Sequence, residues 1–182
     1  MNKTIYEIVN QYADDLSLSD RFEIRLGDGD AWLLQEYVAK INPPNCYVEI
    51  GTLHGGSALV ARDAAKPEVE VYTVDWEDIY KLKHRQDIHF IHAPSLDAAI
   101  DWKKPIGVLF IDGHHELAGV DFGAWDKYVV KGGYILFHDY ASHSPKVISD
   151  CRAIVTCTSE RYKIIYEPSE GKPTSIFVIQ KV

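Results

Sequence analysis

The fold is decided by the stretch Cys46-Tyr47-Val48-Glu49-Ile50-Gly51-Thr52-Leu53-His54-Gly55-Gly56-Ser57. Its first five residues are a short, mostly apolar run, which predicts a buried strand. Glycines follow at positions 51, 55 and 56, and glycine permits a sharp turn and a close approach of the backbone to a ligand. A helix is expected to begin at Ser57. Strand, glycine loop and helix in this order predict the first unit of an α/β domain.

The same alternation continues toward the C-terminus. Further strands are predicted at 69–74, 87–92, 106–111, 134–137, 162–166 and 175–180. Helices are predicted at 57–65, through Trp125 and Val130, and at 145–155, and Lys131-Gly132-Gly133 is predicted to be a turn. Short apolar runs that alternate with helices imply a parallel sheet covered on both faces. We therefore expect a doubly wound, mostly parallel, seven-stranded α/β sheet with helices on both faces and a C-terminal antiparallel hairpin.

Two helices are predicted before the first strand. Apolar residues recur at helical spacing over 3–16. Gly27-Asp28-Gly29 breaks the chain, after which Asp30 is expected to cap a second helix. Asn42-Pro43-Pro44-Asn45 ends that helix. The chain has no repeat or obvious linker, so a single domain is expected over 1–182, with N-terminal helices at 1–44 and the sheet core at 45–182.

Charge and composition restrict the partners. The formal net charge is -8, so the chain lacks the basic field typical of nucleic-acid binders. No run is long and apolar enough to span a bilayer, and the first residues lack an apolar signal core. The three cysteines have no metal-type spacing and fit reduced thiols in a cytoplasm. We expect a cytoplasmic protein that acts on a small molecule, without nucleic-acid or membrane partners; the oligomeric state stays open, a homodimer included.

The glycine loop and the second strand together predict an adenosine-type ligand. Leu53 stands where a dinucleotide site has its middle glycine, which argues against NAD or FAD, and no Gly-Lys-Ser or Gly-Lys-Thr of a P-loop is present. Asp75 ends the second predicted strand, where an acid meets a ribose diol. Glu49 is an acid in an apolar strand, and a ligand ammonium or the loop amides are its expected partners. The alternative is that the glycines make only a tight turn and that Asp75 only caps a helix.

Two segments resemble a known family. Val48-Glu49-Ile50-Gly51-x-x-x-Gly55-x-Ser57 resembles motif I of class I S-adenosylmethionine-dependent methyltransferases. Ile111-Asp112-Gly113-His114-His115, then Trp125, then Lys131-Gly132-Gly133-Tyr134-Ile135-Leu136-Phe137-His138-Asp139-Tyr140 resembles the methyltransferase family 24 group, which includes cephalosporin-hydroxylase-like and macrocin-O-methyltransferase-like proteins. The resemblance covers about 47–155 and implies a Rossmann-like fold.

The resemblance also implies where the cofactor binds. Glu49, Gly51 and Ser57 would line its methionine end, and Asp75 would hold its ribose. Ala93-Pro94-Ser95 would flank the adenine, and Asp112 would sit near the methyl group. Further cofactor-binding candidates beside these residues are Thr52, Gly55, Gly56 and Trp76.

A second group of polar residues predicts a divalent metal. Asp112, His138 and Asp139 follow the fourth and fifth strands, which are expected to be neighbours. Oxygen-rich sites favour Mg²⁺, and an imidazole ligand shifts the preference toward Mn²⁺, Fe²⁺ or Zn²⁺. Such a metal would lower the pKa of a substrate hydroxyl and orient it toward the methyl group. The alternative is that both aspartates cap helices and that His138 is a hydrogen-bonded wall residue.

Several histidines are candidates for a general base, because a pKa of about 6.5 suits that work. His114 falls where some metal-dependent relatives carry an acidic base, and His115 matches a histidine common in the family and is expected to be partly structural. His54 and His143 are further candidates. The leading hypothesis is methyl transfer from S-adenosylmethionine to a sugar or phenol-like hydroxyl of a metabolite. A non-catalytic nucleoside-binding or partner-binding domain and a metal-dependent hydroxylase are the alternatives.

Overall fold

The computed structural model describes residues 3–12, 26–78, 85–141, 144–169 and 171–182. The end of the first predicted helix and His143 lie outside these residues. The helices are α1 (Ile5–Tyr12), α2 (Asp28–Val38), α3 (Gly56–Ala64), α4 (Ser95–Ile100), α5 (Ala118–Trp125) and α6 (Pro145–Cys157), with short 3-10 turns η1 (His115–Leu117) and η2 (Asp126–Tyr128). The strands are β1 (Cys46–Ile50), β2 (Val71–Asp75), β3 (His89–His92), β4 (Ile106–Ile111), β5 (Val129–Phe137), β6 (Tyr162–Tyr166) and β7 (Phe177–Lys181).

The strands form one seven-stranded sheet in the order β3-β2-β1-β4-β5-β7-β6. The pairs from β3 to β5 are parallel, and β7 pairs antiparallel with both β5 and β6. The predicted doubly wound sheet with a C-terminal antiparallel hairpin is therefore confirmed. From β1 the strands are added toward one edge of the sheet (β2, β3), and from β4 they are added toward the other edge (β5). The strand order therefore reverses between β1 and β4, and α/β sheets of this kind bind ligands at that point.

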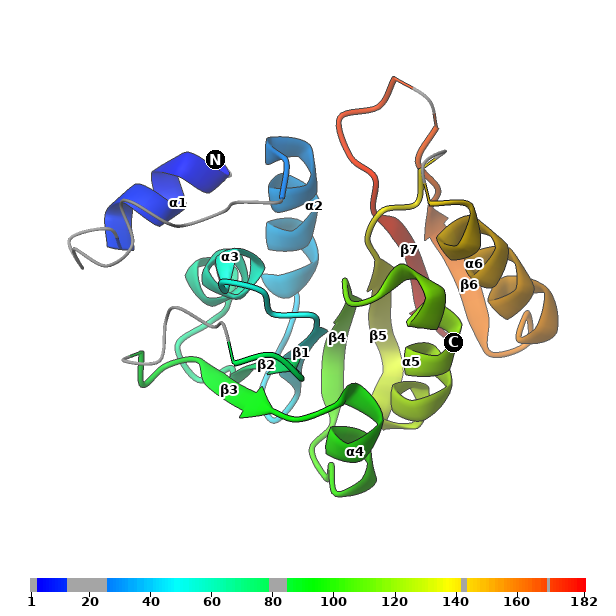
Figure 1. The fold of residues 1–182 in the computed structure, drawn as a ribbon, viewed down its shortest axis with the longest axis horizontal. Helices are drawn as coiled ribbons and strands as arrows, with labels where there is room; N and C mark the ends of the chain where they lie inside the picture. The colour runs from blue at the N-terminus through cyan, green and yellow to red at the C-terminus, as the bar shows by residue number, and fades with distance from the viewer. Residues whose placement is uncertain (1–2, 13–25, 79–84, 142–143, 170) are drawn as a thin grey trace.

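Helices cover both faces of the sheet (Figure 1). Helices α1, α2 and α3 pack with one set of strand side chains, such as Tyr47 and Phe110. Helices α4, α5 and α6 pack with the alternate set, such as Val48 and Leu109. Successive side chains of a strand point to opposite faces. The continuous apolar runs of β1 and β4 therefore contribute side chains to two hydrophobic cores, one on each face of the sheet. None of the helices in the described ranges combines the length and apolarity that a bilayer crossing requires.

The second helix begins earlier than expected, and Asp30 does not cap it. Gly27 occupies the N-cap position, and Asp30 lies inside the first turn of α2, where it is buried. Its Oδ1 accepts hydrogen bonds from Thr174 Oγ1 and from the Ser175 amide. The prediction was wrong because the carboxylate binds the segment that leads into β7, which no local pattern reveals.

The segment 129–133 belongs to a strand, whereas we expected a helix through Val130 and then a turn. Helix α5 ends at Trp125, and β5 begins at Val129. Between the pairs Ile106–Val129 and Val108–Tyr134 the register shifts, so β5 bulges here. Gly132 has a φ of 82°, which suits a bulge. Pairing with β4 thus overrides the local turn signal of the two glycines.

Candidate active site

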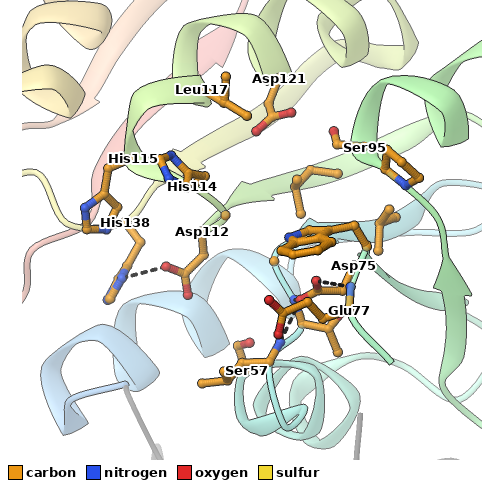
Figure 2. A pocket seen from close by; sticks show the side chains of 18 of the residues that line it. Ser57, Asp75, Glu77, Ser95, Asp112, His114, His115, Leu117, Asp121 and His138 are labelled. Atoms are coloured by element: carbon orange, nitrogen blue, oxygen red, sulfur yellow. Dashed lines mark hydrogen bonds and ion pairs between the residues drawn. The ribbon is translucent and has the colours of Figure 1, made fainter. Parts of the chain in front are cut away.

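One cavity of about 1000 Å³ opens at the carboxyl ends of β1, β2, β4 and β5. Figure 2 shows side chains that line it. Most of the residues predicted from the sequence line this cavity: Gly51, Thr52, His54, Gly56, Ser57, Asp75, Trp76, Pro94, Ser95, Asp112, His114, His115, His138 and Asp139. The parallel strands bring these residues together because their carboxyl ends meet at the same edge of the sheet.

The glycine loop packs tightly against the end of β4. Gly51 has a φ of 93°, in the left-handed region that favours glycine. A Cβ atom at this position would lie 2.3 Å from the backbone oxygen of Asp112. The loop therefore needs glycine at position 51 both for its turn and for this close approach. Gly55, the N-cap of α3 with a φ of 98°, does not line the cavity itself.

Asp75 fixes the glycine loop from the neighbouring strand. Its Oδ2 accepts hydrogen bonds from the amides of Thr52 at 2.8 Å and Leu53 at 3.0 Å. Its Oδ1 accepts from the amide of Glu77 at 3.0 Å. Asp75 is partly exposed and lines the cavity. The carboxylate is thus held in one orientation at the cavity wall.

Glu49 lies behind this wall and is fully buried. Its carboxylate accepts hydrogen bonds from Tyr47 Oη at 2.8 Å and from Thr73 Oγ1 at 2.7 Å. Burial raises the pKa of Glu49 to about 8, although the hydroxyl donors partly offset this effect. The loop amides that we expected as partners of Glu49 bind Asp75 instead, and Glu49 is not among the residues that line the cavity.

The three residues of the predicted metal site do come together. The potential ligand atoms of Asp112, His138 and Asp139 lie within 4.8 Å of one another. His138 Nδ1 lies 2.8 Å from Asp112 Oδ1 and 3.4 Å from Asp139 Oδ2. This nitrogen is buried, and in the described part of the chain it has no partner in hydrogen-bond geometry. A buried imidazole nitrogen that faces two carboxylates is a donor set that suits a divalent cation.

Electrostatics couple the three residues. Burial lowers the pKa of His138, but the neighbouring carboxylates, Asp112 foremost, outweigh burial and raise it well above its ordinary value. The imidazole of His138 beside it lowers the pKa of Asp139, against an opposing effect of burial. Asp139 also has a φ of 56°, which is uncommon for a residue other than glycine. Such backbone conformations cluster at functional sites.

The helix-capping alternative for the aspartates does not hold in the structure. His114 is the N-cap residue of η1, and Ser144 precedes α6 at its N-cap. Asp112 and Asp139 instead face His138 across the ends of β4 and β5.

The two histidines after β4 have different surroundings. His115 Nε2 lies 2.7 Å from Asp139 Oδ2, and His115 Nδ1 lies 3.3 Å from Ser144 Oγ. Both of its ring nitrogens are therefore engaged. His114 accepts a long hydrogen bond of 3.3 Å from the Glu116 amide and is exposed at the cavity.

Sequence reasoning missed one buried acid of the cavity. Asp121 on α5 is buried and lines the cavity near Ser95. Burial raises its pKa, and a hydrogen bond from Ser95 partly offsets this effect. The Trp125 indole donates to Ser95 Oγ at 2.9 Å and so holds that side chain. The signal in the sequence is an acid in an otherwise apolar helix.

Comparisons with known proteins are consistent with this geometry. A family model described as a methyltransferase domain matches residues 48–140. The chain is 33% identical over 129 residues to the uncharacterised protein R132 of Acanthamoeba polyphaga mimivirus, a match that covers 60% of this chain and 58% of that protein. The chain thus spans less than two thirds of the length of this relative.

Two solved structures share the fold over nearly the whole chain. An O-methyltransferase from Bacillus cereus in complex with SAH has a TM-score of 0.70 and 16% identity, with 98% of this chain and 90% of that chain covered. The O-methyltransferase TomG from Streptomyces achromogenes, involved in tomaymycin synthesis and solved with SAM, has a TM-score of 0.68 and 15% identity, with 100% and 90% covered. At these identities the likeness establishes the fold.

Proposed function

Because the chain belongs to the methyltransferase-domain family, as a class I S-adenosylmethionine-dependent methyltransferase, we propose that it methylates a hydroxyl oxygen of a small molecule with the help of a divalent metal. One observation carries the proposal: the Asp75-anchored glycine loop and the Asp112, His138 and Asp139 cluster line the same cavity. The glycine loop suits the cofactor, and the carboxylate–histidine cluster suits a metal that would bind an oxygen acceptor. The solved O-methyltransferases of the same fold support this choice of acceptor atom.

The cofactor is proposed to lie along the edge of β1, β2 and β4. The glycine loop with Gly51, Thr52, Gly56 and Ser57 would hold the methionine end, and Asp75 and Trp76 would face the ribose. Pro94, Ser95 and the buried Asp121 would flank the adenine, where a carboxyl group can bond an amino group. When bound, S-adenosylmethionine supplies an electrophilic methyl group on a sulfonium.

Glu49 is proposed to act through other residues, because it does not reach the cavity. Its Oε1 binds Thr73 Oγ1, which in turn lies in hydrogen-bond contact with Thr52 Oγ1 of the loop. The buried acid would thus fix the position of the loop from behind. Gly55 would contribute in the same indirect way, as the left-handed N-cap that starts α3.

The metal is proposed to bind Asp112, His138 and Asp139. Within the described ranges Nδ1 of His138 has no partner in hydrogen-bond geometry. This nitrogen and the two carboxylates that face it fit a cation of the Mn²⁺ or Zn²⁺ type, with Mg²⁺ as the oxygen-preferring alternative. When bound, such an ion lowers the pKa of a substrate hydroxyl and orients it. Asp112 is proposed to contact both the metal and the cofactor, so the acceptor oxygen would lie next to the transferred methyl group.

The chain's own contribution to the reaction is then mainly positioning and removal of a proton. Holding the acceptor in line with the methyl group makes the displacement effectively unimolecular. His114 is the proposed proton acceptor, because its ring is exposed at the cavity and its bond to the Glu116 amide is long enough to be exchanged for a substrate hydroxyl. His115 is proposed to hold Asp139 rather than to accept the proton, because both of its ring nitrogens are engaged.

The test is product formation. The protein is incubated with S-adenosylmethionine and a panel of sugars and phenols, and mass spectrometry quantifies methylated acceptor and S-adenosylhomocysteine, which are expected in equal amounts. Excess EDTA is expected to lower the rate, and Mn²⁺ is expected to restore it. Calorimetric binding of S-adenosylhomocysteine without any methylated product would favour a non-catalytic binding domain. Full activity in EDTA would show that methyl transfer does not need a metal, while the proposed methyltransferase activity would stand.

A further inference from the structure

We infer that Asp30 is a positioning residue of the metal site: from α2, it holds the imidazole of His138 so that Nδ1 faces Asp112 and Asp139. The inference rests on the metal site of the proposed function. It assigns a role in that site to a residue 108 positions away from His138 along the chain.

The two ring nitrogens of His138 face different carboxylates. Nε2 lies 3.4 Å from Asp30 Oδ2, and Nδ1 lies 2.8 Å from Asp112 Oδ1. Both Asp30 and His138 are only 7% exposed, so neither side chain can turn into solvent. Asp30 does not line the cavity, whereas His138 does. The carboxylate of Asp30 therefore meets the imidazole from behind the cavity wall.

Asp30 is itself held firmly on its other oxygen. Oδ1 accepts from Thr174 Oγ1 and from the Ser175 amide, both at 2.7 Å. The backbone of α2 comes very close to this segment, because a Cβ atom on Gly29 would lie 2.0 Å from the Pro173 carbonyl oxygen. With Oδ1 fixed in this way, Oδ2 stays turned toward His138. Two partly buried hydrogen bonds thus fix the orientation of this one carboxylate.

A carboxylate behind a histidine is a recurrent device of metal sites. A histidine ligand generally donates its second N–H to a carboxylate or carbonyl, which fixes the tautomer and the ring orientation and makes the ligand nitrogen more basic. If Nε2 carries the proton toward Asp30, the lone pair of Nδ1 points at two carboxylates. A cation bound at this point would contact Nδ1 and both carboxylates at once, and Nδ1 has no partner in hydrogen-bond geometry among the described residues.

The second ligand has a matching support. His115 Nε2 contacts Asp139 Oδ2 at 2.7 Å. Thus His138 and Asp139 each have an outer partner from a different element, α2 for the first and η1 for the second. The proposed ligands of the metal are therefore held by a second set of residues that do not themselves bind the metal, and Asp30 belongs to that second set.

The experiment measures Co²⁺ binding, by calorimetry and by the visible absorption of the bound ion, in the full chain. Asp30→Asn keeps an acceptor oxygen for Thr174 and Ser175 but turns an amide N–H toward His138. We expect its Co²⁺ affinity to fall about 10- to 100-fold, with a shifted absorption spectrum and an affinity for S-adenosylhomocysteine within about twofold of wild type. Asp126→Asn, which neutralises another buried aspartate that does not line the cavity, is the control and should bind Co²⁺ like wild type.

The outcomes separate the two levels of inference. Wild-type Co²⁺ affinity and spectrum in Asp30→Asn would overturn the role of Asp30 and leave the metal site standing. An equal loss in Asp126→Asn would also overturn it, because neutralising any buried aspartate would then suffice. Absence of Co²⁺ binding by the wild-type protein would overturn the metal site and the role of Asp30 with it. Should Asp30→Asn fail to fold, Asp30→Glu, which displaces the charge by one methylene, is measured in the same way and is expected to shift the spectrum.

Discussion

The Nδ1 atom of His138 lies 2.8 Å from Oδ1 of Asp112, at the ends of the neighbouring parallel strands β5 and β4. Both residues follow the last residue pair of the two strands, Ile111 and Phe137. The pairing of β4 and β5 therefore sets the distance between them. Two residues that are far apart in sequence become one site because parallel strands end side by side.

Replacing His138 with alanine should abolish the binding of Mn²⁺, because it removes the one nitrogen of the cluster. The affinity for S-adenosylhomocysteine should stay within about threefold of wild type, since the glycine loop and Asp75 are untouched. The free energy of unfolding should fall by about 1–3 kcal/mol, because Asp30 stays buried without its imidazole partner. Calorimetry and urea unfolding measure these effects. His89→Ala, at an exposed position of β3 outside the cavity, is the control; Mn²⁺ binding by His138→Ala at wild-type affinity would contradict the ligand role.

Replacing Asp75 with alanine should weaken the binding of S-adenosylhomocysteine by roughly 10- to 100-fold. The change removes the acceptor of the Thr52 and Leu53 amides and, in the proposed complex, the partner of the ribose. Asp75→Asn separates these roles, because it keeps one acceptor oxygen for the loop. Asp101→Ala, at an exposed position beyond α4 and outside the cavity, should bind normally. An unchanged affinity in Asp75→Ala would show that the ribose assignment is wrong.

Glu49 should make the protein less stable as the pH rises from about 4.5 to about 8. Burial raises the pKa of Glu49 from 4.5 to about 8 in the folded state. The folded state therefore binds more protons than the unfolded state within this window, and the free energy of unfolding falls as pH increases. The slope from this group is at most about 1.4 kcal/mol per pH unit.

The measurement is urea unfolding of wild type and Glu49→Gln at several pH values across this window. The glutamine does not titrate, so the variant should gain stability relative to wild type as the pH rises. Glu36→Gln, at an exposed position of α2, should follow the wild-type profile. Parallel profiles for wild type and Glu49→Gln would mean that Glu49 titrates normally in the folded protein.

The alternation of apolar runs and helices predicted the sheet. It also predicted most of the cavity, because the main candidate residues stand at or directly after the end of a strand. Strands β4 and β6 have the predicted bounds, and β1 was predicted from the same five residues. Asp112, His138 and Asp139 could be placed together once β4 and β5 were expected to be neighbours. Patterns of this kind work where the chemistry is attached to the end of a regular element.

Three of the misses depend on contacts between distant segments. One partner of Glu49 is Thr73, and this pairing follows from the register of β1 with β2, in which the two residues are opposite. Asp30 was expected to cap a helix, because its bonds to Thr174 and Ser175 leave no trace in the sequence around it. Asp121 faces the cavity only because of the way α5 packs on the sheet.

The backbone of Gly51 closely approaches the backbone of Asp112. Alanine at position 51 would place its Cβ 2.3 Å from the Asp112 carbonyl oxygen and would also hold a φ of 93°. Both effects should force the glycine loop away from β4, so Gly51→Ala should lower the melting temperature and weaken S-adenosylhomocysteine and Mn²⁺ binding together. Gly123→Ala is the matched control, because nothing lies within 4 Å of its added Cβ.

Gly123 lies in α5, where alanine is the better helix former by about 1 kcal/mol, so that variant should be as stable as wild type or more so. Thermal unfolding and calorimetry on the two variants give the comparison. If Gly51→Ala kept normal affinity for both ligands, the close packing of the loop on Asp112 would not be needed for the site. A joint loss would show that the cofactor half and the metal half of the cavity depend on the same backbone contact.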